Sequence, residues 1–199
     1  MNDLQSAQPG LRERKKDKTR AALVETALRL FAAQGFGETT INQIAAEVDV
    51  SPRTLLRYFP TKEDIVVSQV ESSMAVFRAR FEEGLTVHPV PAALMMSARA
   101  LIAHYEAQAA FYLAIERTIA ASPEIGARKL AMTGQLADEL ATVAGTAEKG
   151  AAVPGWQIRL YTDVVFCLVR AVIGRWVAEQ GKPSLASLFD EASALIDLR

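Results

Sequence analysis

The sequence predicts an all-α protein made of two helical parts, and three observations support this class. Apolar residues recur at intervals of three and four through most of the chain, and no segment shows the strict alternation of a half-buried strand. Several periodic segments begin with a Ser or Thr that is followed by Pro or by a capping-box residue. Half of the 199 residues are hydrophobic, enough for a small domain over residues 1–64 and a larger one over residues 65–199.

The first domain should begin with a basic arm and one long helix. Basic residues outnumber Glu13 and Asp17 in this arm, although the formal charge of the chain is −1: they are Arg12, Arg14, Lys15, Lys16, Lys18 and Arg20. This pattern fits a solvated arm and also fits contact with phosphates or a minor groove. From about Asp17 to Gln34 the apolar spacing predicts a helix that ends at Gly35.

Residues 39–62 predict a short helix, a tight turn and a second short helix. Thr40 and Gln43 have capping-box spacing, so the first of these helices should begin there. Asp49 should end it with a positive φ, which Asp tolerates better than most residues with a side chain. Ser51 and Pro52 then restart the chain as N-cap and first helical residue.

The second short helix has two different faces. Leu55 and Phe59 lie four residues apart and should point to the core, whereas Arg53, Thr54 and Arg57 share another face. A turn of this kind can hold the second helix where its polar side chains reach base edges in the DNA major groove.

These residues resemble the DNA-binding domain of the tetracycline-repressor (TetR) family. The resemblance runs from about Lys18 to Asp64 and rests on LF-x-x-x-GF, TT-x-x-x-IA, VS-x-x-TL and YF-x-x-KE. It implies an all-helical homodimeric transcription regulator, usually a repressor, with a three-helix N-terminal domain and a larger C-terminal domain, about nine helices in total. Asp49 departs from the usual Gly of the family, and Leu56 departs from a common aromatic residue.

The helix faces and the resemblance together predict the residues that contact an operator in double-stranded DNA. We expect Arg53 and Arg57 at base edges, Leu56 near a thymine methyl group, and a phosphate at the cation Lys62. The full expected set is Arg14, Lys15, Lys16, Lys18, Thr39, Thr40, Ser51, Arg53, Thr54, Leu56, Arg57, Tyr58 and Lys62.

The second domain should consist of helices joined by mostly short connections. The expected helices cover residues 62–83, 91–104, 109–121, 123–144, 156–180 and 185–199. The segment GTAEKGAAVPG is the one long connection. The helix over residues 156–180 is apolar on nearly all sides, so it is either a core helix of a monomer or, as the resemblance implies, part of a dimer. In the second case the last two helices pack against their symmetry mates, and Gly174 allows close approach.

The middle helices contain candidate residues for a small-molecule site. They are Met96, His104, Tyr105, Phe111, Tyr112, Glu116, Arg117, Phe166 and Arg170. Large apolar residues with a few polar groups suit a ligand cavity, but they also suit an ordinary core. Arg117 and Arg170 are stronger candidates, because a charge in an apolar helix must find an anion. The segment from Glu116 to Arg128 also resembles the mycofactocin-regulator-like subgroup, which implies an acyl-type or other hydrophobic effector.

Other classes of protein find little support in the sequence. Gly35 and Gly37 follow a helix rather than a strand, and there is no G-x-S-x-G motif, so we expect no enzyme and no cofactor. The single cysteine excludes an intrachain disulfide, and two histidines do not make a zinc cluster. We expect a cytoplasmic protein without a membrane span, because no apolar run opens the chain. A helical adaptor, or a ligand-binding protein without an operator, would leave the exposed basic residues without a role.

Overall fold

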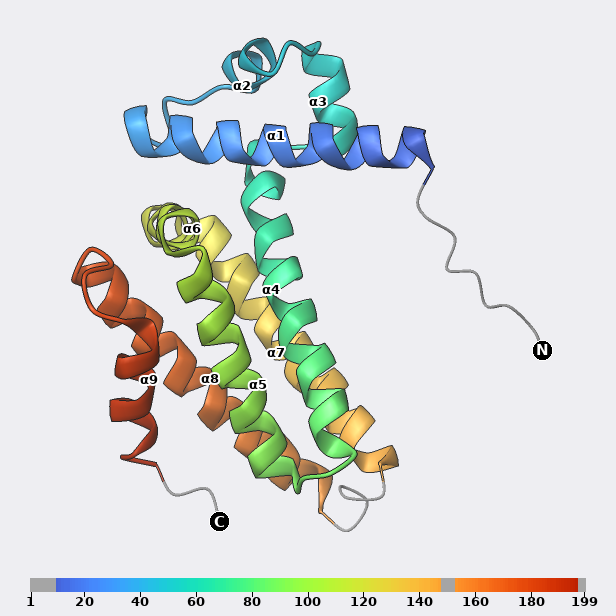
Figure 1. Ribbon diagram of the computed structural model, residues 1–199, viewed down its shortest axis with the longest axis vertical. Helices are drawn as coiled ribbons and strands as arrows, with labels where there is room; N and C mark the ends of the chain where they lie inside the picture. Colours follow the sequence, from blue (N-terminus) through green and yellow to red (C-terminus); the bar gives the residue numbers. More distant parts are fainter. Residues whose placement is uncertain (1–9, 148–152, 197–199) are drawn as a thin grey trace. The chain divides into compact units, whose positions relative to one another are not determined.

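The computed structural model describes residues 10–147 and 153–196, and these ranges contain nine α-helices and no strand, which confirms the all-α class (Figure 1). The helices are α1 (Leu11–Gln34), α2 (Ile41–Glu47), α3 (Pro52–Tyr58), α4 (Lys62–Leu85), α5 (Val90–Ala107), α6 (Ala109–Ala121), α7 (Pro123–Thr146), α8 (Gly155–Ala178) and α9 (Leu185–Ser193). The chain forms two compact units, residues 1–65 and 66–199. The assignment of DNA binding to one unit and of ligand binding to the other stays a prediction.

Helix α1 begins earlier than the sequence predicted. It starts at Leu11 rather than near Asp17, with Gly10 as its N-cap, so the described part of the basic arm is helical. Lys, Arg and Glu are all good helix formers, and Glu13 lies in the first turn, where a negative charge is favourable. The helix ends at Gly35 as predicted, and the φ of this residue is 91°, a value that glycine adopts without strain.

A predicted capping box and the predicted turn fix the ends of α2. The Gln43 amide donates to Thr40 Oγ1 at 3.2 Å, and the Thr40 amide donates to Gln43 Oε1 at 2.8 Å, which completes the capping box. Asp49 has a φ of 55°, as the sequence predicted. This left-handed residue lets the chain turn sharply into α3.

Helix α3 has only seven residues, and two features hold it in place. Ser51 Oγ accepts from the Thr54 amide at 3.1 Å, and Pro52 occupies the first helical position. Leu55 and Phe59 are almost completely buried among residues of the first unit. Because an isolated helix of this length is marginal in water, these contacts rather than intrinsic propensity keep α3 helical.

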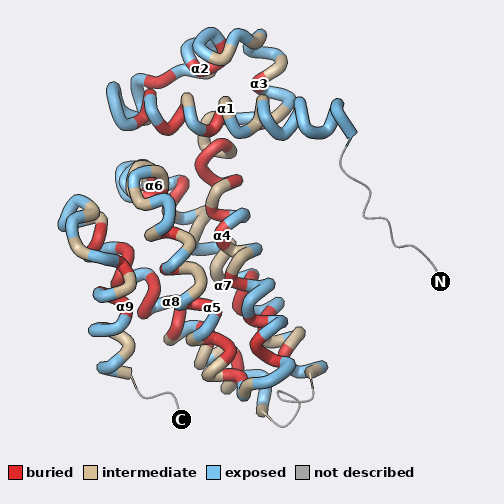
Figure 2. Tube along the Cα trace, viewed as in Figure 1, coloured by how far each residue is buried: buried red, intermediate tan, exposed pale blue. Residues whose placement is uncertain are grey.

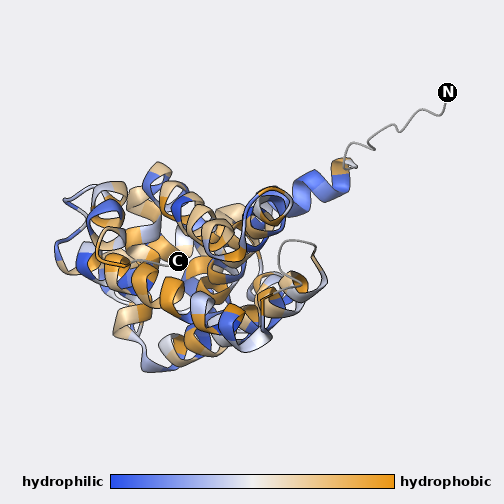
Figure 3. Ribbon diagram, turned by 90° about the horizontal axis from the view of Figure 1, so that it is seen from below, coloured by the Kyte–Doolittle hydropathy of each residue, from blue (hydrophilic) through white to orange (hydrophobic). Residues whose placement is uncertain are grey.

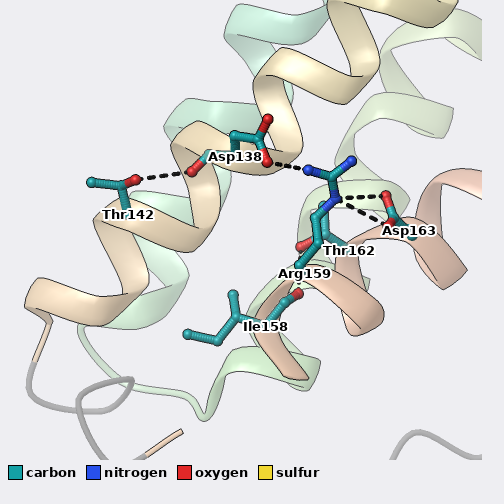
Figure 4. A network of polar contacts seen from close by, with 6 residues as sticks. All are labelled: Asp138, Thr142, Ile158, Arg159, Thr162 and Asp163. Atoms are coloured by element: carbon teal, nitrogen blue, oxygen red, sulfur yellow. Dashed lines mark hydrogen bonds and ion pairs between the residues drawn. The ribbon is translucent and has the colours of Figure 1, made fainter. Parts of the chain in front are cut away.

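In the second unit, α8 packs against α5, α7 and α9, and α5 also packs against α9. Figure 2 shows buried and exposed stretches alternating along these helices, as expected for amphipathic elements. Arg159 of α8 bridges Asp138 of α7 and Asp163 of its own helix (Figure 4). None of the described helices combines the length and the hydrophobicity that a membrane crossing needs.

The predicted boundaries in this unit are correct to within a few residues, with one larger difference. Helix α9 ends at Ser193, short of the expected C-terminus, and the amides that follow close tight turns: Leu195 donates to the Ala192 carbonyl at 3.2 Å, and Ile196 donates to the Ser193 carbonyl at 3.1 Å. Residues 197–199 lie outside the described residues, as do residues 148–152 of the predicted long connection.

The turn at Asp49 yields a test of the fold. Asp49→Gly should leave the free energy of unfolding unchanged or slightly raised, whereas Asp49→Val should lower it by about 1–2 kcal/mol, since a β-branched side chain is strained at positive φ. Urea unfolding followed by circular dichroism measures both. Ala46→Val, on the exposed side of α2, is the matched control and should cost much less. Equal losses for the two valine variants would contradict the assignment.

Candidate functional site

The outward face of α3 presents two guanidinium groups. Arg53 and Arg57 are exposed, and Leu56 between them is 44% exposed. Leu55 faces the core from the opposite side, so the two sets of residues cannot exchange roles. A short rigid helix with exposed arginines is suited to enter the DNA major groove, where arginine pairs with guanine.

Polar residues around α3 mostly serve the local structure as well. Ser51 and Thr54 hydroxyls lie 2.8 Å apart at the start of the helix. Thr40 is exposed at the start of α2, and Tyr58 is half-buried at the end of α3. These four residues stay candidates for phosphate contact, because their positions flank the outward face.

Thr39 and Lys62 are placed differently from the expectation. Thr39 is only 1% exposed, and its hydroxyl donates to the Gly35 carbonyl at 2.8 Å, so this side chain serves the local structure and its phosphate contact stays a prediction. The Lys62 ammonium donates to the carbonyls of Phe36 at 2.7 Å, and of Gly37 and Thr39 at 3.2 Å each. The anion predicted for Lys62 is therefore replaced by three carbonyl oxygens of the connection between α1 and α2.

The basic residues of α1 form one hydrophilic segment. Arg14, Lys15, Lys16 and Lys18 are all exposed on the first turns of the helix. Figure 3 shows these turns, next to the end marked N, as strongly hydrophilic. A helical segment holds its charges in a fixed arrangement, which a frayed arm would not do.

The second unit contains a cavity of about 420 Å³ that is lined mainly by apolar side chains. Four of the predicted ligand residues line it: Tyr105, Glu116, Phe166 and Arg170. The others lie elsewhere. Met96 and Arg117 are exposed, Phe111 lies against the ring of Tyr112, and His104 and Tyr112 are joined by a hydrogen bond of 2.5 Å.

The sequence missed the walls that α4 and α7 contribute to this cavity. Helix α4 supplies Val70, Met74 and Phe77, and α7 supplies Lys129 and Leu136. The apolar spacing of α4 was visible in the sequence, but no residue of this helix was among the predicted ligand residues. Nothing local pointed to Lys129, because its partner lies on another helix.

Glu116 carries the buried charge of the cavity. Its side chain is almost inaccessible, and it accepts hydrogen bonds from Lys129 Nζ at 2.6 and 2.7 Å and from the Tyr105 hydroxyl at 3.1 Å. Burial, and then the negative charge of Glu116, raises the pKa of Tyr105 well above its usual value, so this hydroxyl remains a proton donor. The ion pair therefore joins α6 and α7, and Arg117 takes no part in it. The described residues contain no group of three or more side chains that could hold a metal ion.

Comparison with known proteins indicates the family. The family model for bacterial regulatory proteins of the tetR family matches residues 23–68, which include α2 and α3. The HTH-type transcriptional regulator TcmR of Streptomyces glaucescens is 29% identical over 199 residues, covering 96% of this chain and 87% of that protein. Residues 23–68 therefore match the tetR family of bacterial regulatory proteins, and the chain is similar to a transcriptional regulator over nearly its whole length.

Solved structures of other bacterial regulators share the fold of most of the chain. FadR of Bacillus halodurans superposes with a TM-score of 0.65 at 20% identity, covering 95% of this chain and 96% of that one. FadR of Bacillus subtilis, solved with stearoyl-CoA, gives a TM-score of 0.64 at 19% identity and covers 88% and 96% of the two chains. At such identities the likeness shows the fold alone.

The Lys62 contacts yield a prediction that separates a structural role from phosphate binding. Lys62→Met should lower the free energy of unfolding by about 1–3 kcal/mol, because three carbonyls lose their donor. Urea unfolding provides the measurement. The control Lys18→Met, on the exposed face of α1, should leave stability unchanged. An unchanged stability for Lys62→Met, together with a flatter salt dependence of DNA binding, would instead assign its ammonium to a phosphate.

Proposed function

We propose that this protein is a TetR-family regulator, a dimeric repressor that binds a palindromic operator and releases it when a small hydrophobic or acyl-type effector binds. The proposal that the protein binds DNA rests on the structure of α3. This helix is capped at its start and anchored in the core, and it exposes Arg53 and Arg57 on its outer face. A protein-interaction adaptor would have no use for this arrangement beside a basic α1. We further propose that the protein is cytoplasmic, beside the chromosome, and has no catalytic activity.

The proposed contacts divide into base readout and positioning. Arg53 and Arg57 would pair with guanine edges, and Leu56 would lie against a thymine methyl group. Phosphates would be met by the residues that flank this face: Arg14, Lys15, Lys16, Lys18, Thr40, Ser51, Thr54 and Tyr58. Phosphate contacts fix the register, whereas base contacts select the sequence.

The exposed side of α8 supports the proposed homodimer. Val172 and Leu188 are 3% and 4% exposed, so these residues of α8 and α9 hold the subunit's own core. Elsewhere on α8, Trp156 and Leu160 are exposed. Large apolar side chains that are exposed to solvent favour contact with a partner protein. In a dimer with two-fold symmetry, the two N-terminal units would read the two halves of a palindrome.

The cavity supports an effector of acyl type. Its lining is mostly apolar, and the FadR structures of Bacillus subtilis and Thermus thermophilus were solved with stearoyl-CoA and lauroyl-CoA. A ligand that binds one conformation of the dimer better than another shifts the population toward it. We propose that, in the conformation favoured by the effector, the distance between the two N-terminal units of the dimer does not match the distance between the operator half-sites.

The readout role of Arg57 can be measured on promoter DNA. The wild-type protein should retard the DNA upstream of its target gene but not a shuffled sequence of equal length. Arg57→Ala should weaken this binding by about 1–3 kcal/mol and reduce the preference over shuffled DNA. Lys16→Ala is the matched control, since a lost phosphate contact should weaken both sequences alike. An unchanged preference in Arg57→Ala would remove it from the readers.

The dimer can be tested on the exposed side of α8. Leu160 is 51% exposed, so Leu160→Glu should preserve the helical circular dichroism signal but convert the sedimenting species from dimer to monomer. Operator affinity should fall although no DNA-facing residue has changed. Val87→Glu, at a residue that is 66% exposed outside α8 and α9, is the control and should leave the dimer intact. A wild-type protein that sediments as a monomer, free and on DNA, would contradict the proposal.

A further inference from the structure

The buried ion pair in the cavity has hydrogen-bonding capacity that the fold does not use. Lys129 Nζ has three N–H donors, and its two hydrogen bonds go to the two oxygens of Glu116. The Tyr105 hydroxyl gives its one proton to Glu116 as well. Both charged residues line the cavity, among apolar residues from α4 and α8 such as Phe77 and Phe166. A ligand in this space therefore meets one neutral, strongly polar spot.

The charge of the pair restricts what can bind there. Glu116 is 5% exposed, so its charge is stabilised by Lys129 and not by water. A ligand anion at this spot would compete with Glu116 for the ammonium, and a ligand cation would compete with Lys129 for the carboxylate. Either would leave one buried charge without its partner, which is costly. A neutral acceptor can instead take the remaining N–H of Lys129 without disturbing the pair.

The third charged residue of the lining does not change this argument. Arg170 is exposed, and the described contact of its guanidinium is with Cys167 Sγ at 3.7 Å. Its charge is screened by solvent, whereas Glu116 is shielded from solvent and its partner Lys129 is only 26% exposed. Selection by charge should therefore occur at the pair.

We propose that the effector places an uncharged carbonyl oxygen, as in an ester, thioester, amide or ketone, against Lys129, and that free acids and amines are rejected there. The inference rests on the proposed effector function and deepens it. It separates neutral acyl derivatives from the free acids that share their apolar chains. It also gives Glu116 a role as the residue that makes the cavity unfavourable for carboxylates.

Four probes with chains of similar length test the proposal: 2-undecanone, 2-methyl-1-undecene, decanoate and decylamine. Displacement of Nile red, a neutral dye, reports their affinities near neutral pH for the full chain. The wild-type protein should bind 2-undecanone about tenfold or more better than either ion. It should also prefer the ketone over the alkene, which replaces the carbonyl oxygen by an apolar group of similar shape.

Substitution of either residue of the ion pair should change the relative affinities of the four probes, and the two substitutions should act in opposite directions. In Glu116→Gln, Lys129 has lost its anion, so decanoate should gain about tenfold or more relative to 2-undecanone. In Lys129→Met, Glu116 has lost its cation, so decylamine should gain similarly. Thermal unfolding gives a second readout, since each variant should be stabilised most by the ion that replaces its missing charge. If a single variant does not fold, the double variant Glu116→Gln/Lys129→Met decides: it should bind the ketone and the alkene equally.

The outcomes distinguish this inference from the function on which it rests. A wild-type protein that binds none of the probes overturns both the inference and the acyl-type effector. If the wild type and the variants at Glu116 and Lys129 all bind the probes with the same order of affinity, only the inference is overturned and the proposed function stands. A response of decanoate binding to Arg170→Gln but not to Glu116→Gln also overturns the inference alone, because the head group would then lie at the edge of the cavity.

Discussion

The first unit, residues 1–65, depends on the anchoring of α3, a helix too short to be stable alone. Seven residues give fewer than two turns with internal hydrogen bonds, so the helix exists because Leu55 and Phe59 are buried and Ser51 caps its start. The left-handed turn at Asp49 sets its direction. The arginines on the other face then have fixed positions without contributing to the core. The proposed base contacts and the contacts that stabilise the core therefore lie on different faces of one helix.

In the cavity of the second unit, too, different residues supply the apolar surface and the polar groups. Apolar residues from five helices supply the space, while Glu116, Lys129 and Tyr105 supply one polar spot. A buried ion pair contributes little net stability compared with apolar packing of the same volume, so its presence calls for another explanation. Selectivity for a ligand is such an explanation. The ion pair joins α6 and α7. A ligand that contacts the pair therefore lies at the place where these two helices are held together.

The sequence predicted the parts of the fold that depend on local chemistry. The capping residues Thr40 and Ser51 and the turn at Asp49 act within a few residues, and the structure confirms all of them. It could not predict contacts between distant residues. Lys62 meets carbonyls more than twenty positions away, and Thr39 is buried by the same connection. The extent of the cavity could not be predicted from the sequence either, because its lining depends on how five helices pack together.

Selection of binding sites from a random DNA library by the full-length protein tests the central claim most directly, because the library contains every candidate operator of a given length. The account predicts enrichment of a two-fold symmetric sequence whose half-sites lie about 34–36 Å apart, or a multiple of that distance. Guanines should stand at fixed positions of each half-site, opposite the exposed arginines of α3. Failure to enrich any sequence, or enrichment of a single asymmetric site, would contradict the account.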